Sequence, residues 1–273
     1  MNSPRQPDRH SFLSVLNRSV IIDVFKYLVV VAAITWFMFN GTQKLGYNWQ
    51  WYRVPQYLID SADSQRVPGP LIQGLFITIR ITAISLILAF IFGLASALMR
   101  LSRSFLARAI ARGYLEIIRN TPLLVQLFFI YFVLSPILNI SGFASAVLAL
   151  SLFEGAYASE IFRAGIVSIH REQWEAAFSI GFNTYQTYRL IILPQALRRI
   201  LPPLTSQAVS LIKDSALVST IAIYDITMRG QTIIAETFLV FEIWFTVAAI
   251  YLVMTLALSA TVFYMEKRLK IEL

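Results

Sequence analysis

Cysteine is absent from this sequence of 273 residues, and histidine occurs only as His10 and His170. The absence of cysteine excludes a disulfide framework and any thiolate metal site. With only two histidines, a histidine-built metal centre is also disfavoured. The phosphate-binding pattern GxxxxGK is missing as well. We therefore expect no metal or cofactor on this chain, and no nucleotide bound through that motif.

Charged residues are scarce: 14% of the chain is charged and 57% is hydrophobic. A soluble domain has about 25% charged and about 45 to 50% apolar residues. This composition indicates a membrane protein. The net charge of +8 then reflects the basic bias of cytoplasmic loops better than it reflects binding to nucleic acid. The polar N-terminus is too long for a cleaved signal peptide.

Long apolar runs predict an all-α, polytopic membrane protein, because about 20 mostly apolar residues are needed to cross a bilayer as a helix. The candidate spans are six: Tyr27–Phe39, Ile81–Met99, Thr121–Leu138, Phe143–Phe162, about Leu204–Ile223 and Ile243–Met265. We expect the third to extend backward through YLEIIRN, and the stretch LIQGLFITIR before the second to lie at the membrane interface. The fifth is the most polar.

The basic residues predict the orientation of these spans, since cytoplasmic loops are enriched in lysine and arginine. If the N-terminus is cytoplasmic, that side receives most of them, in the groups Arg5–Lys26, Arg100–Arg112, Arg163–Arg199 and Lys267–Lys270. The opposite side receives only Lys44, Arg53, Arg66 and Arg229. We therefore predict that both termini and the segment Glu172–Leu204 lie in the cytoplasm.

That segment, EQWEAAFSIGFNTYQTYRLIILPQALRRILPPL, is amphipathic and cannot cross a bilayer. Glu172 and Glu175 favour the start of a short helix, and Gly181 can take the left-handed conformation that closes it. Asn183 or Thr184 can cap the next helix, and Pro194 interrupts or begins the following one. Ala176 and Ala177 form a patch of low bulk. The pattern alone fits a partner-binding surface and an ordinary cytoplasmic loop about equally well.

The spacing in this segment resembles the EAA signature of the membrane subunits of ABC importers, EAA-x3-G-x9-I-x-LP, at every fixed position from Glu175 to Pro194. Four further stretches resemble the polar amino acid branch of that family, the histidine, glutamine and arginine permeases. They are YLEIIRNTPLLVQLFFIYF, GAYASEIFRAGI, LPQALRRILPPL and SLIKDSALVSTIAI. The resemblance divides the chain into 1–70, with an extra first span and an aromatic external loop, and a permease core at 71–273 with its EAA loop at about 168–203.

The resemblance implies a type I ABC importer transmembrane domain in a bacterial inner membrane. Its EAA loop would form a coupling helix that docks on a cytoplasmic ATPase dimer, which binds ATP and Mg. Glu175, Ala176, Ala177 and Gly181 would be the contact. An external binding protein would deliver the amino acid, and a second permease subunit, identical or paralogous, would complete the pathway. Two departures are Glu172, where the family usually has glycine, and KDSAL at 213–217, where it usually has KDTSL.

Polar residues within the predicted spans are candidates for the substrate pathway, since an ionisable residue there costs roughly 2.5 to 3.5 kcal/mol on insertion scales. Gln207 and Asp214 share one helix face, and Ser210 and Lys213 share the neighbouring face. Asp214 could bind the α-ammonium group of a substrate, or Lys213 and Asp214 could pair with other charges. Because Gln207 stands where a second acid could lie, we predict a neutral polar or acidic amino acid rather than a basic one.

Two further candidates have structural alternatives. Glu160 can reach Arg163 one turn away, which favours an ion pair over substrate contact. Asn120 can line the pathway or, as we favour, cap the helix that starts at Thr121.

An ion-coupled secondary transporter that uses Asp214 and Glu160 is the main alternative function, but the two halves of the chain show no similarity of the kind common in such folds. An intramembrane enzyme is disfavoured because HExxH and GxSxG are absent.

Overall fold

The computed structural model describes residues 9–44, 46–60 and 67–268. It divides into two compact units, Met1–Gln50 and Trp51–Leu273, which are described separately. The helix of the first unit is α1 (Arg9–Lys44). Residues 51–70, which the sequence grouped with this first span, belong to the second unit. There, the Gly69 amide donates a hydrogen bond to the Leu58 carbonyl at 2.9 Å.

The described residues of the second unit are almost entirely helical and include a small antiparallel pair of strands, in which Ile59 pairs with Pro68. Its first elements are η1 (Trp51–Arg53), α2 (Pro55–Leu58), β1 (Ile59–Asp60), β2 (Val67–Pro68), α3 (Pro70–Leu101), α4 (Phe105–Arg119), α5 (Leu123–Phe128), η3 (Phe129–Leu134) and α6 (Ser135–Leu138). They are followed by α7 (Gly142–Val167), α8 (Arg171–Ser179), α9 (Thr184–Thr187), η4 (Tyr188–Ile192), α10 (Leu193–Asp214), η5 (Ser215–Ile221), α11 (Ile226–Thr237) and α12 (Val240–Arg268). The η elements are short 3₁₀ or π helices.

Within the described residues, four helices are long and apolar enough to cross a membrane, at Ile22–Gly41, Pro70–Leu101, Gly142–Val167 and Val240–Tyr264. A fifth span results if α4 and the helices from Leu123 to Leu138 are counted together. The predicted span at 204–223 does not meet the same criterion because of its polar residues. It is formed by α10, which has Pro202 and Pro203 in its interior, and by the 3₁₀ helix η5.

The stretch LIQGLFITIR belongs to α3, which begins at Pro70 and runs through it without a break, and its place at the membrane interface stays a prediction. One detail of the predicted spans is wrong. The third span does not extend backward as one helix, because α4 and α5 meet at an angle of 106°. The cause is local: Pro122 disfavours a helical conformation at Thr121 and has no N–H to donate.

The most extensive helix packing in the core is between α3 and α7. Small residues recur every four positions along α3, at Ser85, Ala89, Gly93 and Ala97, and all are buried. A Cβ added at Gly93 would lie 2.7 Å from the Ala158 Cβ and 3.0 Å from the Gly155 carbonyl oxygen. Between membrane helices, such small residues allow backbone contact and the dispersion attraction that follows from it.

The turn before α11 is tied to the first part of α3. Asp225 is buried and caps α11 by accepting a hydrogen bond from the Met228 amide at 2.8 Å. The Thr78 hydroxyl accepts a further hydrogen bond from the Ile226 amide at 3.2 Å. Burial raises the pKa of Asp225 to about 6. These contacts hold α11 against α3.

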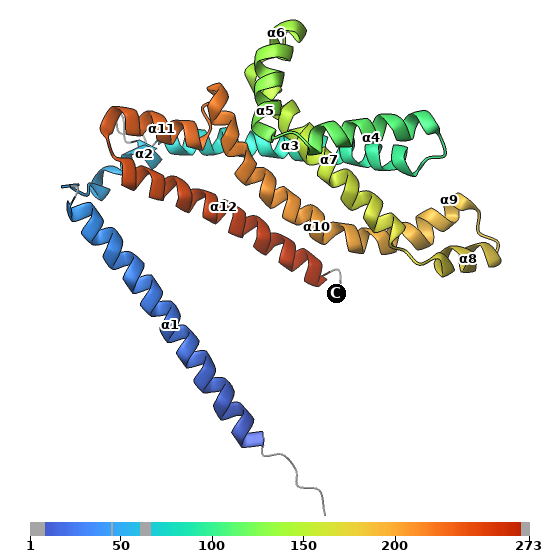
Figure 1. Cartoon of the computed structure of the whole chain (residues 1–273). Helices are drawn as coiled ribbons and strands as arrows, with labels where there is room; N and C mark the ends of the chain where they lie inside the picture. The colour runs from blue at the N-terminus through green and yellow to red at the C-terminus, as the bar shows by residue number, and fades with distance from the viewer. Residues whose placement is uncertain (1–8, 45, 61–66, 269–273) are drawn as a thin grey trace, which may run out of the picture. The chain divides into compact units, whose positions relative to one another are not determined.

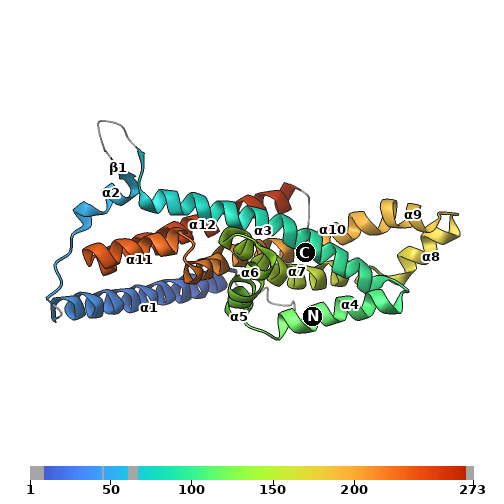
Figure 2. The same cartoon turned by 90° about the horizontal axis from the view of Figure 1, so that it is seen from above.

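Some of the short elements of the second unit lie at its two ends, while α5 and α6 project from its middle (Figure 1). In both views, α8 and α9 lie at one end, and α2 and α11 lie at the other (Figures 1 and 2). The helices α3, α7, α10 and α12 run between these ends. A cytoplasmic α8 would therefore place the strand pair and α11 outside.

The substitution Gly93→Ala tests the α3–α7 contact. We expect it to lower the melting temperature of the purified protein, because the new methyl group would meet the backbone of α7. The control is Gly113→Ala in α4, where a Cβ meets nothing within 4 Å and where alanine should stabilise the helix by about 0.5 to 1 kcal/mol. Equal melting temperatures for the two variants would contradict this packing.

Candidate functional site

The segment predicted to be a coupling helix forms a short helical hairpin. Helix α8 covers Arg171–Ser179, with Glu172 in its first turn. Gly181 has a φ of +86°, and the Phe182 amide donates to the Ala177 carbonyl at 3.1 Å. Asn183 then caps α9 through a reciprocal pair of hydrogen bonds with Gln186. The predicted roles of Gly181 and Asn183 in the local fold are confirmed.

The hairpin is attached to the ends of α7 and α10. The Trp174 ring packs edge-on against Tyr188, with 4.8 Å between ring centroids. The Gln195 amide donates to Gln173 Oε1 at 3.1 Å. At the end of α7, the Ser168 carbonyl accepts a hydrogen bond from Arg199 Nη1 at 2.5 Å. These contacts connect α8 to the start of α10, and the start of α10 to the end of α7.

The residues of the EAA pattern do not all face outward. Glu175 is exposed and pairs with Arg171 at 2.8 Å, and Ala176 and Gly181 are also exposed. Ala177, in contrast, is only 3% exposed. The expected patch of two open alanines is therefore reduced to Ala176, while Ala177 lets α8 approach its own chain.

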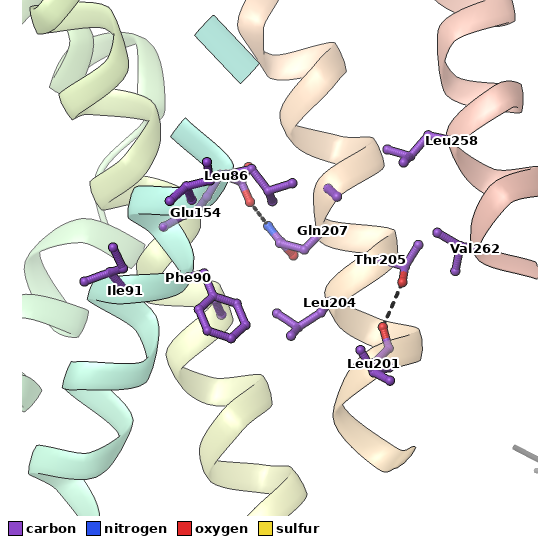
Figure 3. Close-up of a pocket in the computed structure, with 14 residues that line it drawn as sticks. Leu86, Phe90, Ile91, Glu154, Leu201, Leu204, Thr205, Gln207, Leu258 and Val262 are labelled. Atoms are coloured by element: carbon purple, nitrogen blue, oxygen red, sulfur yellow. Dashed lines mark hydrogen bonds between the residues drawn. The ribbon is translucent and has the colours of Figure 1, made fainter. Parts of the chain in front are cut away.

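A polar contact between α7 and α10 lies in the transmembrane part of the unit. The Gln207 amide donates a hydrogen bond to Glu154 Oε2, and the two side chains point toward one another (Figure 3). Asp214 lies close enough to Glu154 for their side chains to interact. Gln207 and Asp214 lie seven residues apart on α10, which is about two helical turns, as the predicted shared face requires.

Glu154 was not among the predicted site residues, although it is 1% exposed and has one oxygen, Oε1, without a hydrogen-bond partner. It lines a cavity of about 470 Å³ whose other walls are mostly apolar residues of α3, α10 and α12, such as Phe90, Leu204 and Leu258 (Figure 3). A buried carboxylate oxygen without a donor is costly. It can therefore accept a hydrogen bond from a ligand that enters this cavity.

The other two predicted pathway residues on α10 are Ser210 and Lys213. Lys213 is exposed and its charge acts on Asp214, while Ser210 is half-buried. The charges near Gln207 are thus two carboxylates and one ammonium group.

Glu160 lies apart from this group and joins three helices. Its Oε1 accepts hydrogen bonds from Arg100 Nη1 of α3 at 2.6 Å and from Arg119 Nη1 of α4 at 3.3 Å. Its Oε2 accepts two from Arg163, both at 3.4 Å. The predicted ion pair with Arg163 is confirmed, but the pair with Arg100 is shorter and connects residues 60 positions apart.

Asn120 closes α4 instead of capping the helix after it, so that expectation is wrong. Its amide donates to the Glu116 carbonyl at 2.7 Å and to Glu116 Oε2 at 2.9 Å. The bend that follows is held by the Gln126 amide, which donates to the carbonyls of Ile118 and Thr121 at 2.7 and 3.0 Å. The N-cap residue of the next helix, α5, is Pro122.

Asn120 and Glu160 meet in a second cavity, of about 290 Å³, between α3, α4 and α7. Its walls are largely polar and comprise Arg100, Arg112, Leu115, Glu116, Arg119, Asn120, Tyr157 and Glu160. The structure therefore divides the predicted pathway residues into two groups: Gln207, Ser210, Lys213 and Asp214 on α10, and Asn120 and Glu160 around this cavity.

Comparison with known families and structures agrees with this architecture. Residues 89–271 match the family described as "Binding-protein-dependent transport system inner membrane component". The glutamine transport system permease protein GlnP of Escherichia coli (strain K12) is 40% identical over 204 residues, which cover 74% of this chain and 93% of that protein. The L-cystine transport system permease protein TcyB of Bacillus subtilis (strain 168) is 41% identical over 199 residues, which cover 72% and 85%.

Solved structures show the same fold. A crystal structure of an amino acid ABC transporter with histidines is 38% identical, has a TM-score of 0.69, and is matched over 73% of this chain and 94% of that chain. The MetNI methionine ABC transporter, in an inward-facing conformation, matches at 18% identity with a TM-score of 0.63, over 73% and 96%. At that identity, the second match concerns the fold alone.

The described fold and the match over residues 89–271 define an integral membrane subunit of a type I ABC importer. The chain belongs to the family of binding-protein-dependent transport system inner membrane components. It is a multi-pass permease subunit of the inner membrane and not an enzyme, since ATP hydrolysis resides on a separate subunit in this class of transporter.

Proposed function

We propose that this permease carries a polar amino acid, received from an external binding protein, along a pathway that passes Gln207 and Asp214. The observation that carries this proposal is that α10 makes two sets of contacts. Its first turns bind the α8 hairpin through Gln195 and the end of α7 through Arg199, and its middle part presents Gln207 to Glu154. Movement of α8 would therefore change the polar contact within the membrane.

The proposed ATPase contact is formed by Glu175, Ala176 and Gly181, which are exposed on the α8 hairpin. Ala177 would act indirectly, by allowing α8 to pack closely on its own chain. A cytoplasmic ATPase dimer that carries ATP and Mg would drive this surface, and two permease subunits would alternate between inward and outward states. This scheme places α8 and both termini in the cytoplasm, as the distribution of basic residues predicts.

The charges around Gln207 favour a neutral polar amino acid. Glu154 and Asp214 offer two carboxylates, and Lys213 offers one ammonium group. One carboxylate could bind the α-ammonium group and Lys213 the α-carboxylate, which matches the zwitterionic head of an amino acid, and the carbonyl oxygen of Gln207 is left for an uncharged polar side chain. The initial preference for neutral or acidic substrates is thereby narrowed, because an acidic side chain would meet Glu154 or Asp214.

The ion-coupled alternative has less support. The α8 hairpin has no role in such a mechanism, and Glu160 is already neutralised by arginines of three helices. The family match and the relatives with known names are consistent with the ATP-driven importer.

Uptake of a panel of labelled amino acids by the reconstituted complex tests the substrate proposal. We expect the neutral polar amino acids to be taken up in preference to acidic and basic ones. Gln207→Leu should lower this uptake at least tenfold, because Glu154 then loses its hydrogen-bond donor; a tenfold change corresponds to about 1.4 kcal/mol. Ser206→Ala, on the exposed side of α10, is the control. Uptake confined to basic or acidic amino acids would contradict the proposed substrate class.

The coupling surface is tested by Ala176→Gln, which places a long side chain on the exposed face of α8. We expect the partner ATPase to co-purify at least tenfold less with this variant, since the added bulk separates the two surfaces. The matched control is Ala235→Gln, which changes an exposed alanine on α11 at the other end of the unit. Normal ATPase binding by the Ala176→Gln protein would show that α8 is not the contact.

A further inference from the structure

The polar cavity between α3, α4 and α7 combines charges of both signs. Arg100, Arg112 and Arg119 line it together with Glu116 and Glu160. Glu160 forms ion pairs with Arg100 and Arg119, and also with Arg163, which does not line the cavity. Among the described residues, neither Arg112 nor Glu116 has an ion-pair partner, and Glu116 receives a hydrogen bond only at Oε2, from Asn120. The cavity thus presents one unpaired guanidinium group and one unpaired carboxylate.

The charges that line the cavity argue against contact with lipid tails. Glu160 precedes the end of α7 at Val167 by seven residues, or about 10 Å at 1.5 Å per residue. On α4, Arg108, Arg112, Glu116 and Arg119 follow one another at helical spacing on one face. Charged residues at such a depth face a cavity filled with water or protein, since exposure to hydrocarbon is costly.

The opposite face of α4 supports the same conclusion. Leu106, Ile110 and Ile117 lie there at the same helical spacing and are all exposed, at 67%, 55% and 67%. Between the two faces, Ala111 and Leu115 pack against the core. The apolar face of α4 therefore suits lipid, and the charged face borders the space that the permease encloses.

We propose that this cavity is a second binding station for the substrate, on the cytoplasmic side of the contact between Glu154 and Gln207, and that it recognises the zwitterionic head common to α-amino acids. This inference rests on the proposed function. The α-carboxylate pairs with Arg112, while Arg119 stays paired with Glu160 and keeps its guanidinium group over the Tyr157 ring at 5.5 Å. The α-ammonium group pairs with Glu116. The volume of about 290 Å³ leaves room for a side chain that is not itself bound by charge.

This station would explain why Glu160 is fixed by three arginines. A free carboxylate beside Glu116 would compete for the α-ammonium group and repel the α-carboxylate. With Glu160 neutralised by Arg100, Arg119 and Arg163, the cavity retains Arg112 and Glu116 as a matched pair of opposite charges. Substrate would leave the first station, bind here by its head group, and then pass to the cytoplasm.

Binding of labelled glutamine to the purified permease–ATPase complex, in nanodiscs and without binding protein, tests this inference. We expect two sites per permease chain. Arg112→Gln and Glu116→Gln should each weaken one of them at least tenfold, while Asp214→Asn should weaken the other. The matched controls are Arg103→Gln and Glu236→Gln, both exposed and outside the cavity. None of the four substitutions at the exposed positions 103, 112, 116 and 236 should lower the melting temperature of the complex.

Analogues of glutamine identify the recognised group. At this station, the amine that lacks the carboxylate and the acid that lacks the ammonium group should both bind at least tenfold more weakly than glutamine. A single site in the wild-type complex, or a second site unaffected by both variants, would overturn the inference. So would bound phosphatidylglycerol that is lost in Arg112→Gln while glutamine binding is unchanged, because the cavity would then hold a lipid phosphate.

The uptake panel tests the proposed function independently of the second station. If the wild-type complex takes up no amino acid in the uptake panel, the proposed function fails. If uptake is normal and only one site is found, the second station alone fails.

Discussion

The close contact between α3 and α7 is the constraint on which the rest of the second unit depends. Lipid tails are as apolar as leucine, so burial of apolar surface cannot by itself bring two membrane helices together. Ser85, Ala89, Gly93 and Ala97 instead remove side-chain bulk along one line of α3, and Gly155 and Ala158 do the same on α7. The resulting approach brings Arg100 to Glu160 and holds α7 in the position from which Glu154 reaches Gln207.

A second set of contacts links this pair to the α8 hairpin. Arg199 and Gln195 of α10 bind the end of α7 and the first helix of the hairpin, and Ile200 packs so tightly on Gly165 that an added Cβ would lie 2.2 Å from its Cγ1 atom. Helices α7 and α10 therefore contact one another near α8 and again at Glu154 and Gln207. A change at the first contact can in this way reach the second through α10.

Local features of the sequence predicted local structure well. Gly181 and Asn183 act through their own backbone and nearest neighbours, so their turn and cap could be read from residue type. The bend at Thr121-Pro122 carried an equally local signal, but the apolar run around it suggested a continuous span. Asn120 was assigned to the wrong helix because asparagine can close one helix as well as start another.

Long-range contacts were not accessible in the same way. Glu154 stands in a helical stripe with Tyr157 and Glu160, and no periodicity indicates that one carboxylate meets Gln207 while the other meets Arg100. Those partners depend on which faces of α3, α7 and α10 pack together. The prediction that Ala176 and Ala177 are both exposed was wrong for the same reason, since the burial of Ala177 is set by tertiary packing.

The central claim is that the α8 hairpin and α10 move as one body when ATP binds. Because the chain has no cysteine, cysteines placed at the exposed positions Ser179 and Ser206 can be spin-labelled without background. The distance between these two labels within one permease chain, measured by pulsed electron paramagnetic resonance in the complex with and without ATP, is the direct test. The account predicts an unchanged, narrow distance in both states, whereas a change in that distance on ATP binding would show that α8 moves independently of α10 and would contradict it.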